Sequence, residues 1–103
     1  MIFETFVITE ILGLLPLVNP SGRLYHLRTH DQLEIDGLIE LGSRRLVFEV
    51  KASQTVTAAD AAPIERWLKL KPEHGPGIVL YAGENYQPLS ANVRAVPASL
   101  LFG

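Results

Sequence analysis

The chain has 103 residues, 48% of them hydrophobic and 19% charged, which suits one globular domain with a modest core and excludes a disordered chain. Nine Lys and Arg residues against eleven Asp and Glu residues give a formal net charge of −2, so the overall basic excess typical of DNA-binding proteins is absent, although a local basic face is not excluded. Cysteine is absent, which excludes disulfides and thiolate metal sites and fits a reducing, cytoplasmic setting.

The first expected element is a helix over residues 2–15. Apolar side chains recur along it at helical spacing, namely Phe3, Phe6, Val7, Ile11, Leu14 and Leu15. Pro16 and the Asn-Pro-Ser-Gly turn segment at 19–22 are expected to end it. Because residues 1–18 lack a basic start and contain two glutamates, we expect neither a signal peptide nor a membrane-spanning segment.

Three strands are expected next, over residues 23–29, 33–41 and 45–52, and the short connections between them predict antiparallel hairpins. The second strand alternates, with Leu38 as the exception, between an apolar side and an acidic side: Leu33, Ile35 and Ile39 against Glu34, Asp36 and Glu40. The third strand also has two faces: Leu46, Phe48 and Val50 against Val47, Glu49 and Lys51.

A second helix is expected to run through Leu70 and to bury Ile64, Trp67 and Leu68. The segment Thr-Ala-Ala-Asp at 57–60 has the form of a capping box. Pro63 lies too deep for the first turn of a helix capped by Thr57, so we expect a kink or a later helix start.

A buried strand is expected at 78–82, residues 91–96 could add a further short strand, and 97–102 should close against the core. Since a helical crossover precedes strand 78–82, that strand should be parallel to a neighbour and the sheet should be mixed.

Asp36, Glu49 and Lys51 are the candidate catalytic residues. Glu49 and Lys51 project from one face of their strand because they are two residues apart. A two-residue turn at 42–43 would pair Asp36 with Glu49 and Glu34 with Lys51, whereas a turn centred on residue 43 would set Asp36 against the opposite face. The glycine at position 42 favours the two-residue turn.

Two carboxylates so placed can share Mg²⁺ or Mn²⁺, with the Val50 carbonyl and waters completing an oxygen shell. Such a metal polarises a phosphate and lowers the pKa of a bound water, and Lys51 could orient that water or neutralise developing charge. The residues alone leave a second interpretation open, since two acids and a lysine on a solvated strand face are common. The strongly apolar opposite face favours a central strand, where charges are costly unless they are paired or used.

Two further acids could join this cluster. Glu4 shares a helix face with Ile8, Ile11 and Leu15 and could reach the same site as an auxiliary acid, or it could simply lie at the exposed helix N-terminus. Glu34 shares a strand face with Asp36 and could be a further ligand or a solvated acid.

The stretch Glu-Ile-Asp at 34–36, followed by Phe-Glu-Val-Lys-Ala-Ser at 48–53, resembles the D…ExK core of the PD-(D/E)XK nuclease-like superfamily. More narrowly, the chain looks like the domain of unknown function found C-terminal to the ATPase module in a group of prokaryotic AAA-type ATPases. The likeness extends to Phe-Glu-Thr-Phe-Val at 3–7, Leu-Tyr-His at 24–26 and Ile-Val-Leu-Tyr-Ala-Gly at 78–83, so it covers nearly the whole chain.

This resemblance implies an α/β fold with a restriction-endonuclease-like αβββαβ core in a single domain, 1–103. It further implies that Asp36 and Glu49 are metal-binding acids for Mg²⁺ or Mn²⁺, that Lys51 is a catalytic lysine and that Glu4 is the acid of the first helix. DNA and an AAA-type ATPase module are the implied partners. The alternative is an inactive protein-interaction or dimerisation domain, which the mean hydropathy of +0.20 favours through spare apolar surface. A third reading is anion or nucleotide binding by Lys51 and Arg44 without chemistry.

Overall fold

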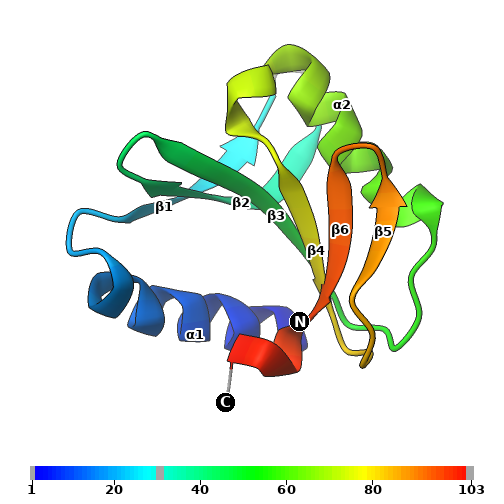
Figure 1. The fold of residues 1–103 in the computed structure, drawn as a ribbon, viewed down its shortest axis with the longest axis horizontal. Coiled ribbons are helices and arrows are strands. Elements are labelled where there is room, and N and C mark those ends of the chain that lie inside the picture. The colour runs from blue at the N-terminus through cyan, green and yellow to red at the C-terminus, as the bar shows by residue number, and fades with distance from the viewer. Residues whose placement is uncertain (1, 30–31, 102–103) are drawn as a thin grey trace.

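The computed structural model describes residues 2–29 and 32–101, which form one sheet with a helix on each face (Figure 1). The helices and strands in chain order are α1 (Ile2–Val18), β1 (Arg23–Arg28), β2 (Glu34–Leu41), β3 (Arg44–Lys51), α2 (Ala62–Leu70), β4 (Gly77–Tyr81), β5 (Gln87–Ser90) and β6 (Val93–Pro97). Short 3-10 turns are η1 (Ala58–Ala61), η2 (Pro72–His74) and η3 (Ala98–Leu101). The expected α/β order of helix, three strands, helix and strand is confirmed.

The sheet has six strands in the order β1-β2-β3-β4-β6-β5. The pairs β1–β2, β2–β3 and β5–β6 are antiparallel, whereas β3–β4 and β4–β6 are parallel. The mixed sheet is therefore confirmed, with the crossover through η1 and α2 leading into the parallel strand β4. Strand β5 was not predicted. It lies at the sheet edge, where Pro88 is tolerated because an edge strand has N–H groups that need no partner.

Each face of the sheet carries its own apolar core. The core on the α2 side contains Leu33, Ile35, Leu38, Val47, Ala61, Ile64, Trp67, Leu68, Val79 and Val93. The core on the α1 side contains Val7, Ile11, Phe48, Leu80 and Ala98, with Ile39 and Val50 packed against it. Strand β3 is thus covered on both faces, which agrees with its interpretation as a central strand.

The β2–β3 hairpin has the predicted two-residue turn at Gly42 and Ser43. Leu41 is paired with Arg44, and the same register continues to Gly37 and Phe48. Gly42 has a φ of +63°, the left-handed conformation that a glycine adopts without the steric penalty of a Cβ. The turn therefore fixes the register that brings Asp36 opposite Glu49.

The predicted alternation along β2 was wrong at one point. Ile39 packs on the α1 side, whereas Leu33, Ile35 and Leu38 lie in the core on the α2 side. The reason is a β-bulge: the pairing of β1 with β2 shifts between Tyr25 and Leu27. A bulge adds one residue to one strand, so apolar side chains three apart can face the same side.

Helix boundaries also differ from expectation. Pro16 lies inside α1, which continues to Val18, and its missing N–H removes a bond only from the last turns of the helix. The α-helix α2 begins at Ala62 after the turn η1, which places Pro63 in its first turn and confirms the later start. No helix within the described ranges is long and apolar enough to cross a membrane. Part of the connection expected at 30–32, and the end of the segment expected at 97–102, lie outside the described residues.

Candidate active site

Asp36 and Glu49 meet where β2 and β3 separate, and we call these two residues the fork pair. Beyond the pairing of Gly37 with Phe48, side chains replace the backbone ladder between the two strands. Glu49 Oε1 accepts a hydrogen bond of 2.7 Å from the Asp36 N–H, and Asp36 Oδ2 accepts one of 2.7 Å from the Val50 N–H. Each carboxyl group is thereby held by the backbone of the opposite strand.

The bulge in β2 helps to place the fork pair. Asp36 and Gly37 together oppose the single residue His26 of β1, and His26 Nδ1 lies 3.5 Å from the Asp36 carbonyl oxygen. Gly37 lies directly against the fully buried Phe48 ring, since a Cβ at this position would come within 2.3 Å of Cε1. Bulges commonly redirect side chains beside functional sites, and this one lies at the base of the fork pair.

Both carboxyl groups of the fork pair titrate above their usual range. Burial raises the pKa of Asp36 to about 6, against the opposing effect of the hydrogen bond from Val50. Burial and the neighbouring Asp36 charge raise the pKa of Glu49 to about 7. Close carboxylates in a half-buried place disfavour each other's ionised form. The pair is therefore poised to change protonation state near neutral pH.

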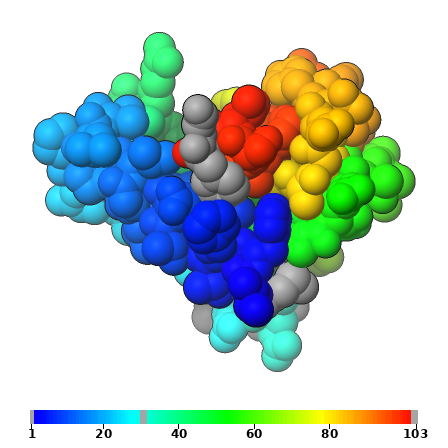
Figure 2. Space-filling model, turned by 90° about the horizontal axis from the view of Figure 1, so that it is seen from below, coloured from blue at the N-terminus to red at the C-terminus, as the bar shows by residue number. Residues whose placement is uncertain are grey.

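Glu4, in the first turn of α1, faces the fork pair from the helix side. The interaction of its carboxyl group with the Asp36 side chain raises the pKa of Asp36, and its charge also raises the pKa of Glu49. Figure 2 shows the start of α1, in dark blue, next to the chain that follows β3, in green. The structure thus brings Glu4 to the same place as Asp36 and Glu49.

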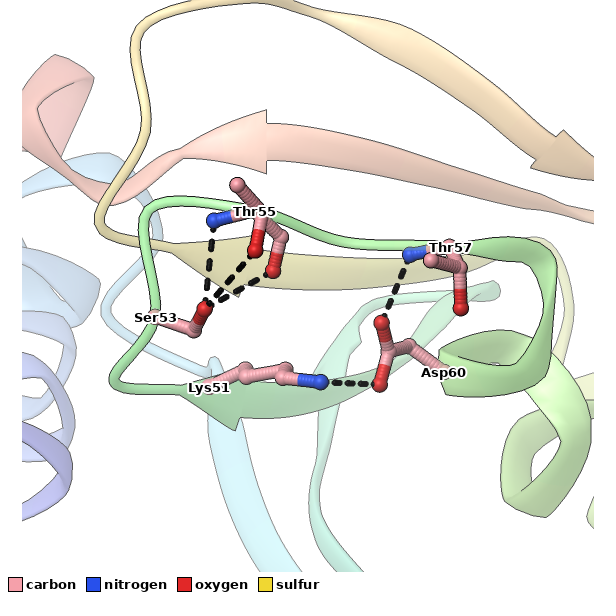
Figure 3. A network of polar contacts seen from close by, with 5 residues as sticks. All are labelled: Lys51, Ser53, Thr55, Thr57 and Asp60. Carbon is pink, nitrogen blue, oxygen red and sulfur yellow. Dashed lines mark hydrogen bonds and ion pairs between the residues drawn. The ribbon is translucent and has the colours of Figure 1, made fainter.

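Lys51 lies at the end of β3 and is held by an acid that sequence analysis did not select. Its Nζ forms an ion pair with Asp60 Oδ1, and Asp60 Oδ2 accepts a 2.7 Å hydrogen bond from the Thr57 N–H (Figure 3). The ion pairs found among the described residues do not join Lys51 to Glu49 or Asp36. Glu34 does not form an ion pair with Lys51 either, since the Glu34 carboxylate binds Arg28 at 2.5 Å.

A cavity of about 200 Å³ connects the two halves of the site. Its walls are Glu49, Val50, Lys51, Ala59, Asp60, Pro63 and Val79. Glu49 and Lys51 project from the same side of β3, as their spacing predicts, and both border this cavity.

The donor set for a metal consists of two carboxylates rather than a full cage. No group of three or more His, Asp or Glu side chains is arranged to hold a metal ion within the part of the chain that the structure describes. The backbone hydrogen bonds use Glu49 Oε1 and Asp36 Oδ2, so a cation would be held by the second oxygen of each carboxyl group, with the Glu4 carboxyl group beside that of Asp36. Two hard oxygen donors with raised pKa values suit Mg²⁺ or Mn²⁺, which keep several waters in their shells.

These features define a small α/β domain with a six-stranded mixed sheet and a carboxylate pair at the fork between two of its strands. The chain belongs to the family described as "Domain of unknown function (DUF4143)", whose model matches residues 1–101. Uncharacterized proteins of Mycobacterium tuberculosis (strain H37Rv) and Mycobacterium bovis are each 33% identical to it over 100 residues. These alignments cover 97% of this chain but only 21% of each relative, so the chain spans about a fifth of their length. No solved structure matches the chain.

The capping-box pattern at 57–60 is visible in the sequence, but the second role of Asp60, as the partner of Lys51, is not. Nine residues separate these two side chains along the chain. The contact follows from the path of the chain, because the segment that leaves β3 returns along the sheet and begins η1 beside Lys51 (Figure 3).

Proposed function

We propose that this domain is a metal-dependent nuclease-like domain of the PD-(D/E)XK superfamily, with hydrolysis of DNA phosphodiester bonds as its reaction. The observation that carries the proposal is the fork pair: two carboxyl groups joined through both backbones, with raised pKa values. A purely structural pair of acids is usually neutralised by cations or multiple donors, whereas perturbed carboxyl pairs are typical of functional sites. The order α1, β1, β2, β3, α2, β4 agrees with the αβββαβ core of that superfamily.

In this proposal Asp36 and Glu49, together with the Val50 carbonyl, would hold Mg²⁺ or Mn²⁺, and the metal would supply Lewis acidity toward a phosphate oxygen and a water. Glu4 accepts a hydrogen bond from a water at the site, as its position beside Asp36 allows. Lys51 donates an N–H to a phosphoryl oxygen and offsets the negative charge that develops there. Because the ionised carboxylates of this site would repel a phosphate, a bound cation is needed before a phosphate can approach.

The test is cleavage of linear and supercoiled DNA in Mn²⁺ or Mg²⁺, compared between the wild type and Asp36→Asn/Glu49→Gln. These isosteric changes keep an oxygen for each backbone N–H, so folding should survive and be verified by circular dichroism. Cleavage that disappears in the double variant but persists in Glu65→Gln supports the assignment. Equal cleavage by wild type and double variant would assign it to a contaminant and contradict the proposal.

An accessory role beside an AAA-type ATPase module is part of the same proposal. The mycobacterial relatives are about five times as long as this chain, so the domain they share with it accounts for a fifth of each. One test takes the part of a full-length relative that lies outside the shared domain. Co-purification of that part with this domain, together with DNA-stimulated ATP hydrolysis by the two, would support the accessory role. An ATPase rate unaffected by the domain would contradict it.

A second candidate function is protein interaction, and the surface of α1 favours it. Five large apolar side chains on this helix are at least half exposed: Ile2, Phe6, Leu12, Leu17 and Val18. A groove of about 400 Å³ between α1 and the sheet is lined almost wholly by aliphatic groups, including Ile11, Leu15, Ile39, Leu46 and Ile78. Exposed apolar surface of this kind commonly marks a contact with another protein.

Light scattering coupled to size exclusion tests the self-association form of this second function. A homodimer that dissociates in Leu17→Ser/Val18→Ser, two strongly exposed positions, would support a dimerisation domain built on α1. A wild-type monomer at high concentration would contradict self-association through this helix.

A further inference from the structure

The ammonium group of Lys51 forms an ion pair with Asp60, and both residues line the cavity that Glu49 also borders. The Lys51 side chain is 40% exposed, so its four-carbon stem would ordinarily sample many rotamers. Here its Nζ is paired with Asp60, whose own side chain is only 17% exposed. A mobile cation is thereby tied to a less exposed anion.

Asp60 is itself held from two directions. One carboxylate oxygen binds Lys51 and the other accepts the Thr57 N–H at 2.7 Å, while the Asp60 N–H donates to the Thr57 carbonyl oxygen at 3.0 Å. Burial acts to raise the pKa of Asp60, but the hydrogen bonds from Lys51 and the Thr57 N–H outweigh it and lower the pKa, so Asp60 stays ionised at neutral pH. The closed turn at the start of η1 therefore presents a charged, oriented carboxylate to Lys51 (Figure 3).

The alternative partner for Lys51 is close in sequence and on the same side of β3. Glu49 borders the same cavity, and its side chain projects from β3 on the same side as that of Lys51. An unrestrained Lys51 could reach toward this acid and occupy one of the oxygens proposed to hold the metal. In the structure the ammonium group pairs with Asp60 and not with Glu49.

We propose that Asp60 is the positioning residue for Lys51: the ion pair fixes the ammonium group at the cavity wall, with two N–H groups left for a phosphoryl oxygen, and keeps it off Glu49. This inference rests on the proposed nuclease function. It assigns a reaction role to a residue that the ExK pattern does not include.

Asp60→Asn is the sharpest variant because the amide oxygen can still accept the Thr57 N–H, so the turn is kept and only the charge is removed. Glu65→Gln is the matched control, since Glu65 is also an acid of this segment but binds Ser90 and Asn92 instead. Both variants are compared with the wild type in the intact chain.

The first readout is spectroscopic and needs no activity. Labelling of lysine Nζ with ¹⁵N gives signals from Lys51, Lys69 and Lys71, of which Lys69 and Lys71 are exposed. We expect a slowed, hydrogen-bonded ammonium signal for Lys51 that shows coupling to the Asp60 carboxyl carbon. This signal should be lost in Asp60→Asn and retained in Glu65→Gln. A Lys51 signal that is the same in wild type and Asp60→Asn would overturn the positioning role.

The second readout is kinetic. Misplacing one catalytic group typically costs about 10- to 100-fold in rate, so Asp60→Asn should lower kcat by about that factor with KM changed by less than about threefold. An unchanged or higher kcat would show that Asp60 restrains rather than positions Lys51, and would overturn the inference. A wild type that neither binds Mn²⁺ nor cleaves DNA would instead contradict the proposed function, and with it the reaction role of Asp60.

Discussion

Two pairs of acids in this small domain have opposite electrostatic environments. Asp60 and Glu65, which we call the capped acids, receive several hydrogen bonds and titrate below their usual range. The fork pair, Asp36 and Glu49, receives one backbone hydrogen bond per carboxyl group and titrates above its usual range.

The difference between the two pairs separates a structural carboxylate from a candidate functional one. The capped acids stabilise the fold in the ionised state, since their donors and Lys51 favour the charge. In the fork pair, by contrast, burial disfavours the ionised state of both acids. A divalent cation would offset that cost, which is why we propose the fork pair rather than the capped acids as the metal site.

The largest expected effect comes from breaking the backbone support of the fork pair. In Gly37→Ala the new Cβ would lie 2.3 Å from the buried Phe48 ring, so the ring or β2 must move. Overpacking of this kind costs about 3 kcal/mol in the free energy of unfolding. Urea denaturation measures it, with Gly13→Ala as the control, because nothing lies within 4 Å of a Cβ there. Equal stability of the two variants would contradict the packing described for the bulge.

The next effect is on the pH dependence of stability. Because the folded pKa values of Asp36 and Glu49 lie above their ordinary values of 3.8 and 4.5, their contribution to stability is complete below about pH 4 and is lost as the pH rises through 6 and 7. Pairs of pKa values this far apart correspond to roughly 6 kcal/mol in total for fully buried groups. Because both side chains are partly exposed, we expect the free energy of unfolding to fall by about 2 kcal/mol over this window without metal. Asp36→Asn/Glu49→Gln should remove most of that fall, as measured by denaturation at several pH values. The same fall in the double variant would mean that other groups cause it.

Single substitutions in the two pairs should change the free energy of unfolding in opposite directions. At pH 8, Glu49→Gln should raise the free energy of unfolding by about 1.5 kcal/mol, because the amide retains an acceptor for the Asp36 N–H and removes a disfavoured charge. Glu65→Gln should lower it by about 1 kcal/mol, since charge-assisted bonds from Ser90 and Asn92 are weakened. Thermal unfolding of both variants checks this. The contrast between the pairs fails if both changes have the same sign.

The smallest expected effect concerns His74, whose contribution to stability depends on pH in the opposite direction to that of the fork pair. Trp67 Nε1 donates a 2.9 Å hydrogen bond to His74 Nδ1, and burial lowers the pKa of His74 below 6.5. A lowered histidine pKa gives stability that is present above pH 6.5 and lost as the pH falls through the folded value. Protonation should cost about 1 kcal/mol and change the fluorescence of Trp67, the single tryptophan. A His74→Phe variant whose acid dependence equals that of the wild type would contradict this.

The sequence alone was sufficient for the features that depend on local pattern. The glycine at 42 predicted the turn and hence the register that joins Asp36 to Glu49, and the apolar face of β3 predicted its central place. Side-chain alternation along β2 could not be predicted, because a bulge is decided by the partner strand β1. The Lys51–Asp60 ion pair escaped prediction for a similar reason, since it depends on how the crossover returns to the sheet.

The most direct test of the central claim, that the fork pair is a cation site, is calorimetric titration with Mn²⁺ near pH 6.5 in two buffers of different ionisation enthalpy. Binding to an acid pair with raised pKa values must release protons, so the apparent heat should differ between the buffers by about one proton per ion. We predict this release for the wild type and Glu65→Gln, and no binding for Asp36→Asn/Glu49→Gln. Binding that is unchanged in the double variant, or that releases no proton, would contradict the account.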